Sequence, residues 1–311
     1  MTKSFLRCGL ALALLAAAAT PARAWDELGH KVVARIAWDN LTPQARARAI
    51  AVLMAAPANS GIRELLPQDG RPLEEQHRDW FVNMSYWADQ IRGREHPGNR
   101  FHQAEWHYVN HFWEQRTPGG RIIDRPDKGT AGFLLDRLAV YRDSLTGQPT
   151  PENAVALAWV LHLVGDVHQP MHNSARITPE DPDGDRGANS FRLAGLFPFN
   201  NLHSVWDGLM GPAFPLMRGD ASESGYVGRI AQTVQRRHPR SRVAGQLQPN
   251  DFTGWSRQGM RLAQQVGYPV WLRRGERVPR RYLSQSYNAV EPRIALAGYR
   301  LADMLERQLA R

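Results

Sequence analysis

The chain has 311 residues, of which 42% are hydrophobic and 22% are charged. This balance is typical of a globular protein and excludes wholesale disorder, a collagen-like repeat and a multi-span membrane protein. The one cysteine, Cys8, excludes a disulfide framework and any cysteine-ligated metal site in the rest of the chain. The formal net charge of +9 suits a polyanionic partner without identifying one.

The N-terminus has the pattern of a secretory signal peptide. A basic start is followed by an apolar stretch, 9–19, that is too short to span a bilayer. Ala22-Arg23-Ala24 then matches the small-residue pattern of a cleavage site. We therefore expect residues 1–24 to be removed before Trp25, which would deliver the mature protein to the periplasm or the exterior. No later apolar run is long enough to cross a membrane.

The rest of the chain, 25–311, is predicted to fold as one mostly helical, all-α domain. Thr42 and Pro43 have the cap and first-residue chemistry of a helix that continues to about Met54. The same Thr-Pro signal at 150–151 precedes a long apolar stretch. Near the C-terminus, apolar residues recur at helical spacing: Ile294, Ala297, Leu301, Leu305 and Leu309. Gly- and Pro-rich loops are expected at 55–72, 93–100, 117–132 and 173–200.

Polar residues inside the second of these helices carry the first functional signal. His162 and Asp166 are four residues apart, so they share one helix face, and His172 follows just after Pro170. Burying such groups is costly unless they are paired with each other or bound to a metal. The segment alone leaves both interpretations open: a metal site, or a hydrogen-bonded His–Asp pair in the core.

Three further segments repeat this chemistry. His203 and Asp207 are again four residues apart, while Asp89 and His107 each stand among aromatic residues. Each segment alone is weak, because a histidine near aromatic side chains is more often an ordinary core residue. Together they offer only nitrogen and oxygen ligands, which suit a catalytic zinc site in an oxidising compartment.

Signal-peptide removal would add an unusual candidate ligand. It would free the α-amino group of Trp25, whose reference pKa is about 7.7–8.0, five residues before His30. A nearby divalent cation would deprotonate this amine and bind it beside the Trp25 carbonyl oxygen. The alternative is that Trp25 caps the first helix and that His30 lies on the surface.

These segments, taken in order, resemble the zinc-dependent single-strand nuclease and 3′-nucleotidase family of the S1/P1 type. The matching motifs are W-x-x-x-G-H from Trp25, W-A-D ending at Asp89, a histidine followed by an aromatic at His107, H-x-x-G-D-x-x-Q-P-x-H from His162, and N-L-H-x-x-W-D ending at Asp207. Gly298 to Ala302 resembles the last helix of the family. The resemblance therefore spans most of the mature chain, and nine ligand positions match in order.

The resemblance implies three Zn²⁺ ions. The buried ion would be held by Asp89, His107, His162 and Asp166. The second would be held by Trp25 through its amine and carbonyl, by His30, and by the shared Asp166. The third, more exposed ion would be held by His172, His203 and Asp207. The remaining histidines have no role in the family: His77, His96, His102, His111, His168 and His238. Of these, His111 and His168 lie close enough in sequence to ligands to be candidates for supporting them.

The resemblance also implies the chemistry. A metal-activated hydroxide would attack phosphorus in line, with Asp166 bridging two ions and the third ion neutralising the departing 3′ oxygen. Arg92 occupies the position of a phosphate-contacting arginine, although a solvated helix residue is the alternative. Tyr108 would stack on an unpaired base. Asn110 stands where fungal relatives have Asp, and Asn189 matches a family Gly-x-Asn segment only loosely.

The function implied is an exported phosphodiesterase, acting as a monomer on single-stranded DNA and RNA, that leaves 5′-phosphorylated products and also dephosphorylates 3′-nucleotides. Arginine-rich stretches at 236–242 and 272–281 would guide a polyanion, or are simply solvated. The main alternative is a zinc-dependent phospholipase C. It is disfavoured by the short spacing from Trp25 to His30 and by Asp instead of Glu at Asp207. A non-enzymatic zinc-binding protein is a second alternative, but structural zinc sites are usually closed and rich in cysteine.

Overall fold

The computed structural model describes residues 25–196 and 199–309. The expected signal peptide, 1–24, lies outside these residues. The described residues form twelve α-helices and six short strands. The helices are α1 (Glu27–Asp39), α2 (Pro43–Met54), α3 (Leu73–Met84), α4 (Trp87–Gln90), α5 (Leu134–Ser144), α6 (Pro151–Asp166), α7 (Leu202–Asp207), α8 (Met210–Ala213), α9 (Glu223–Arg237), α10 (Arg240–Val243), α11 (Phe252–Leu262) and α12 (Arg280–Leu309). The mostly helical fold expected from the sequence is confirmed.

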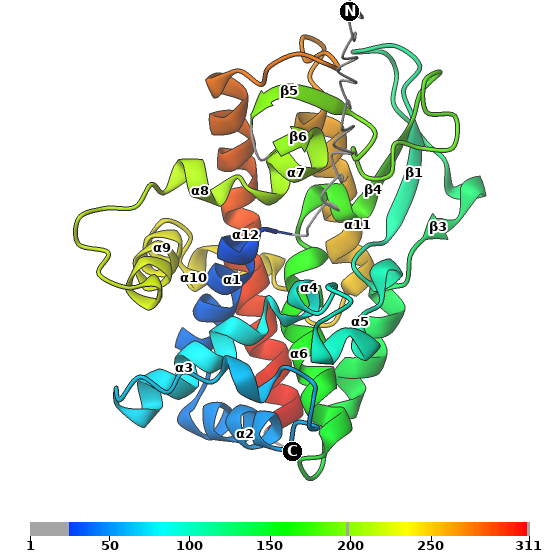
Figure 1. Ribbon diagram of the computed structural model, residues 1–311. Helices are drawn as coiled ribbons and strands as arrows, with labels where there is room; N and C mark the ends of the chain where they lie inside the picture. The colour runs from blue at the N-terminus through cyan, green and yellow to red at the C-terminus, as the bar shows by residue number, and fades with distance from the viewer. Residues whose placement is uncertain (1–24, 197–198, 310–311) are drawn as a thin grey trace, which may run out of the picture.

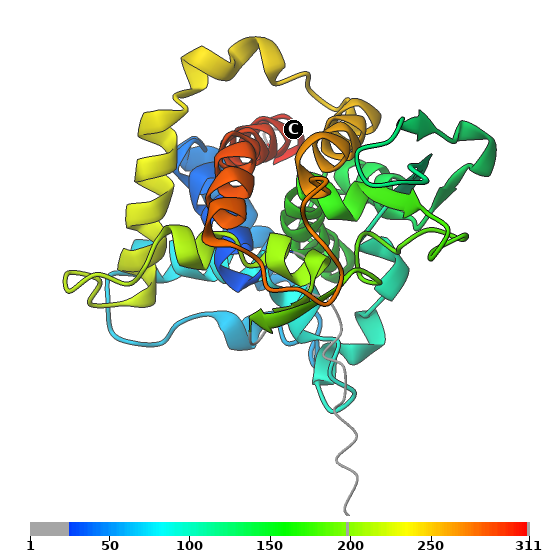
Figure 2. The same cartoon turned by 90° about the horizontal axis from the view of Figure 1, so that it is seen from above.

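Two helices, α6 and α12, form the centre of the molecule, and α1 packs beside them (Figure 1). Every residue of α6 from Asn153 to Asp166 is buried, because this helix is apolar on almost all of its faces. Helix α1 approaches α12 so closely that a Cβ at Gly298 would overlap Ile36. Seen from above, the yellow helices α9 and α10 lie on one side of this centre and the teal strands of residues 110–131 lie on the other (Figure 2).

The helix starts expected from the sequence are confirmed in detail. The Thr42 hydroxyl accepts a hydrogen bond of 3.2 Å from the Ala45 amide, and Pro43 is the first residue of α2. The Thr150 hydroxyl caps α6 in the same way, at 3.1 Å from the Asn153 amide. Each cap satisfies an amide at the helix start that has no partner within the helix. No helix in the described part of the chain is both long enough and apolar enough to cross a membrane.

The segments between the helices, including the expected loops, contain more structure than the sequence indicated. Strand β1 (Asn110–Glu114) pairs antiparallel with β2 (Ile123–Asp124) and β3 (Thr130–Ala131), and parallel with β4 (Ser174–Ile177). Strands β5 (Arg192–Leu196) and β6 (Phe199–Asn201) form a hairpin. Short 3₁₀ and π segments also occur between or next to the helices: η1 (Arg63–Leu65), η2 (Pro97–Phe101), η3 (Ala104–Trp106), η4 (Pro126–Lys128), η5 (Pro170–Asn173), η6 (Ala244–Gln246) and η7 (Ala263–Gly267). Strands of two to five residues are too short to show an alternating pattern, so the sequence did not predict them.

The parallel pairing of β1 with β4 has a direct consequence for the site. Strand β1 begins three residues after His107, and β4 begins two residues after His172. The pairing continues beyond the strands, since the Val109 amide donates to the His172 carbonyl at 2.9 Å. Two segments that are 65 residues apart in sequence are thereby fixed side by side at the end of α6.

Candidate metal centre

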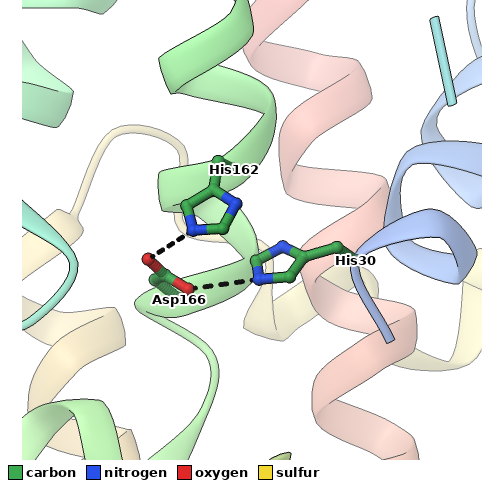
Figure 3. Close-up of side chains that lie close together, drawn as sticks. All are labelled: His30, His162 and Asp166. Carbon is green, nitrogen blue, oxygen red and sulfur yellow. Dashed lines mark ion pairs between the residues drawn. The ribbon is translucent and has the colours of Figure 1, made fainter. Parts of the chain in front are cut away.

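The first cluster of the site joins the last turn of α6 to α1. His162 and Asp166 share one face of α6, and His30 approaches from α1 (Figure 3). The two carboxylate oxygens of Asp166 face different histidines: Oδ1 lies 3.3 Å from His30 Nε2, and Oδ2 lies 3.2 Å from His162 Nε2. All three side chains are fully buried, and the two imidazole rings stack with centroids 4.0 Å apart. His30 is therefore not the surface residue of the alternative interpretation.

A second cluster shares His162 with the first. It adds Asp89 from α4 and His107, which follows η3. His107 Nδ1 lies 3.2 Å from Asp166 Oδ2 and 3.8 Å from Asp89 Oδ1, and His162 Nε2 is also 3.8 Å from that Asp89 oxygen. The Oδ2 atom of Asp166 thus contacts both His107 and His162, while its Oδ1 atom contacts His30. This core is therefore more than an isolated His–Asp pair.

The third cluster consists of His172, His203 and Asp207. His203 Nε2 lies 3.1 Å from His172 Nε2 and 3.6 Å from Asp207 Oδ2, while His172 Nε2 lies 3.8 Å from Asp207 Oδ1. Helix α7 supplies His203 and Asp207 at i and i+4, and η5 supplies His172. Within each of the three clusters, the candidate ligand atoms all lie within 4.8 Å of one another.

Backbone carbonyls fix which nitrogen of each imidazole can bind a ligand. The Nδ1 atom of His162 donates to the Ser85 carbonyl at 2.8 Å, and that of His203 donates to the Gly187 carbonyl at 2.6 Å. His172 Nδ1 donates to the His107 carbonyl at 2.5 Å in the same manner. A neutral imidazole that donates through Nδ1 keeps its Nε2 lone pair for a metal, and such supporting hydrogen bonds are usual around metal-binding histidines.

The clusters contain buried polar atoms without hydrogen-bond partners. Such atoms occur on five residues of the clusters: His30, Asp89, His107, Asp166 and Asp207. Leaving one polar group unsatisfied in a protein interior costs about 1–3 kcal/mol, so five in one place call for a ligand. Divalent cations in the clusters would satisfy His30 Nε2 and the carboxylate oxygens Asp89 Oδ2, Asp166 Oδ1 and Asp207 Oδ2. The unpartnered Nε2 of His107 is not among these atoms, because His107 faces its cluster through Nδ1. The donor set therefore fits metal ions.

Burial and neighbouring charges set the protonation of these groups. Burial lowers the pKa of His30 to about 4 and that of His107 to about 3, so both imidazoles are neutral at pH 7. Burial opposes ionisation of Asp166, but His162 and His172 hold the pKa of its carboxyl well below the usual range. Burial raises the pKa of Asp207 to about 8, which a cation in the third cluster would reverse.

The expected mature N-terminus is fixed at the same place. The Trp25 indole Nε1 donates to the Gly165 carbonyl at 2.9 Å, and the Asp26 amide donates to the Asp207 carbonyl at 3.0 Å. Trp25 is fully buried, and the cap of α1 is Asp26, whose side chain accepts from the Gly29 amide. Trp25 is therefore held between α6 and α7 instead of capping α1.

A cleft of about 510 Å³ opens beside the clusters. His107, His172 and His203 line it, together with all four residues expected to contact substrate: Arg92, Tyr108, Asn110 and Asn189. Arg92 is not a solvated helix residue, since its Nη2 lies 2.5 Å from Asp89 Oδ1. Asn110 is 9% exposed, and its amide oxygen has no hydrogen-bond partner. Asn189 donates to the Arg186 carbonyl at 2.8 Å.

Sequence reasoning missed the residues that hold the end of α6. His168, one of the two candidate supporting histidines, accepts from Arg300 Nη1 at 2.7 Å, and the Arg293 guanidinium donates to the carbonyls of Val167 and His168. Burial lowers the pKa of Arg293 to about 10, so it stays charged at neutral pH and faces the negative end of the helix dipole. The sequence signal that could have indicated this support is the presence of Arg293 and Arg300 among the apolar positions of α12.

Gln169 is a second supporting residue that the sequence did not single out, although it lies inside the motif from His162. Its amide nitrogen donates to Asp207 Oδ1 at 2.6 Å, and its amide oxygen accepts from the Met171 amide. Asp207 is thereby oriented toward its cluster. The other candidate, His111, instead contacts Ser256 on α11 at 2.8 Å.

Three of the nine arginines in the two arginine-rich stretches form ion pairs with acidic residues of the protein. In 236–242, Arg237 pairs with Glu291 and Arg240 pairs with Asp303. In 272–281, Arg274 pairs with Asp181. The solvated-loop interpretation therefore accounts for these three arginines without a polyanion.

Comparison with known proteins gives a consistent picture. The S1/P1 nuclease family model matches residues 25–310, which include every residue of the three clusters. Nuclease PA3 of Penicillium sp and nuclease P1 of Penicillium citrinum are each 22% identical to the chain over 296 residues, which cover 90% of this chain and 96% of each relative. Nuclease S1 of Aspergillus oryzae is 26% identical over 184 residues, 59% of this chain and 53% of that relative.

A glycine in α6 allows the close approach of His30. A Cβ at Gly165 would lie 2.6 Å from His30 Nδ1 and 2.8 Å from His30 Cε1. We predict that Gly165→Ala lowers the free energy of unfolding by about 1–3 kcal/mol, because the ring or a helix must move. Urea denaturation measures this. The matched control is Gly211→Ala, whose Cβ would meet no atom within 4 Å, and equal stability losses in both variants would contradict the steric account.

Proposed function

This chain belongs to the S1/P1 nuclease family and is a hydrolytic nuclease, and on that premise we propose its specific activity. We propose an exported, zinc-dependent phosphodiesterase that cleaves single-stranded DNA and RNA to 5′-phosphorylated products and removes the phosphate from 3′-nucleotides. The observation that carries this proposal is the set of three buried His/Asp clusters, two of them joined through His162, beside one cleft.

Three zinc ions fit the donor sets. One would be bound by Asp89, His107, His162 and Asp166, one by Trp25, His30 and Asp166, and one by His172, His203 and Asp207. The two oxygens of Asp166 already face His30 and His162 separately, which suits a carboxylate that bridges two ions. When bound, such ions lower the pKa of a water molecule and stabilise negative charge on phosphate oxygens.

The side chains of the cleft would position the substrate. The Arg92 guanidinium, oriented by Asp89, can donate two parallel hydrogen bonds to the scissile phosphate and stabilise the charge that develops there. The exposed face of Tyr108 offers a stacking surface for a base, which must be unpaired to reach it. Asn110 can both accept from and donate to the edge of that base, unlike an ionised Asp, which only accepts.

Export would complete the metal centre. Removal of residues 1–24 would free the amine of Trp25. The Trp25 indole is hydrogen-bonded to α6, and the amide of Asp26 is hydrogen-bonded to α7, so the freed amine would lie between these two helices. The mature domain, 25–311, would then act in the periplasm or outside the cell as a monomer. A phospholipase C is not favoured, since the S1/P1 nuclease family model matches residues 25–310.

The activity is tested with the mature protein that begins at Trp25. We predict hydrolysis of single-stranded DNA, RNA and a 3′-nucleotide, each abolished by a chelator and restored by zinc. Phosphatidylcholine serves as the competing substrate in the same assay. Hydrolysis of the lipid without hydrolysis of nucleic acid would refute the proposal, and products with 3′-phosphate ends would refute the stated cleavage polarity.

The role of Asp166 is tested separately. Asp166→Asn keeps the size of the side chain but removes the charge that two cations would share, so we predict a loss of kcat of about a hundredfold to a thousandfold. The bound zinc should fall by more than one ion per chain, measured by atomic emission. Asp136→Asn, on the exposed face of α5, is the matched control. Retention of three zinc ions by Asp166→Asn would contradict the bridging role.

A further inference from the structure

One segment of the cleft has an unusual backbone. Arg186, Gly187 and Ala188 lie between β4 and β5 and all have positive φ, at 57°, 63° and 66°. Side chains other than glycine adopt this left-handed conformation at a cost of roughly 1–2 kcal/mol per residue, so the surrounding structure must hold the segment in place. Neither Arg186 nor Ala188 would take this conformation by local preference.

A buried carboxylate holds this segment. Asp185 is 1% exposed, and its Oδ1 accepts from the amides of Arg176 and Ala188 at 3.0 and 3.1 Å. Its Oδ2 accepts from the Tyr268 hydroxyl at 2.6 Å. The carboxylate therefore bonds to groups on both sides of Arg186 in the chain and to a third residue from outside the segment. The backbone at Arg186 is fixed by these contacts.

The same segment is tied to the third cluster. The Gly187 carbonyl accepts from His203 Nδ1 at 2.6 Å, and a Cβ at Gly187 would overlap the Met171 carbonyl. No room remains for the segment to shift toward the cluster. Arg186 directly precedes Gly187, whose carbonyl orients the His203 imidazole. The Cα of Arg186 therefore has a defined position relative to His203.

The side chain of Arg186, by contrast, is exposed and lines the cleft with Tyr108 and His172. Asp183 also lines the cleft, but within residues 25–196 and 199–309 no ion pair joins an acidic group to Arg186. Arg92 differs, because Asp89 already offsets part of its charge.

We propose that Arg186 binds a backbone phosphate next to the scissile one, and so favours polynucleotides over 3′-mononucleotides. The inference rests on the proposed function, since it assumes nucleic acid in the cleft. A strained segment costs stability, and here it fixes the backbone of an exposed arginine, for which no ion pair is found among the described residues, beside the third cluster. A 3′-mononucleotide has only the phosphate that is cleaved, whereas each internal linkage of an oligonucleotide has charged neighbours that Arg186 can contact.

The test compares the mature, zinc-loaded protein with Arg186→Gln. For hydrolysis of decathymidylate at low salt, we predict that kcat/KM falls about tenfold, mainly through KM, because one charge-assisted contact is lost. The slope of log(kcat/KM) against log salt concentration should decrease in magnitude by about 0.7, the contribution of one phosphate of a single strand. Hydrolysis of 3′-AMP should change less than about twofold. Arg186→Lys should retain the salt slope. Arg307→Gln is the matched control, since Arg307 is exposed in the last turn of α12.

Other outcomes would overturn the proposal. An equal loss on decathymidylate and 3′-AMP would place Arg186 at the scissile phosphate, and an unchanged salt slope would exclude a phosphate contact. Binding of a hydrolysis-resistant phosphorothioate decathymidylate, followed by fluorescence anisotropy, gives a readout that does not require turnover. If the wild-type protein hydrolysed neither substrate, the proposed function would fail, while the salt slope of this binding would still decide whether Arg186 contacts phosphate.

Discussion

The carboxylate of Asp166 is the point on which the rest of the site depends. It is fully buried at the end of an apolar helix, and its two oxygens face histidines that come from different parts of the chain. A buried carboxylate with no cation is costly, whereas one that shares several cations is stable and strongly ionised. The fold brings α1, α4 and the segment after η3 to this one group, and each of them contributes a candidate ligand.

Hydrogen bonds from the surrounding structure orient the side chains of the clusters. Carbonyls of Ser85, His107 and Gly187 hold three imidazoles so that Nε2 faces inward. Just after Asp166, the last residue of α6, Arg293 of α12 donates to the carbonyls of Val167 and His168, and Arg300 donates to the His168 imidazole. A site supported in this way loses little conformational freedom on binding its ions, which is the physical meaning of preorganisation.

The sequence predicted the parts of this arrangement that depend on side-chain type and spacing. Both Thr-Pro helix starts are present in the structure. The two His–Asp pairs with i, i+4 spacing, which end at Asp166 and Asp207, each lie on one helix. It did not predict the β1–β4 pairing, because such short strands have no periodic pattern. Nor did it predict the carbonyl partners of the histidines or the backbone at Arg186, since a backbone acceptor can belong to any residue type and a left-handed arginine is set by its surroundings.

The central claim is that Asp166 bridges two metal ions and that a third lies apart from them. The most direct measurement is anomalous diffraction at the zinc absorption edge from crystals of the mature protein, beginning at Trp25 and purified with zinc. The account predicts three peaks, two on either side of the Asp166 carboxylate and one between His172, His203 and Asp207. A single peak at Asp166, or zinc bound away from these clusters, would contradict it.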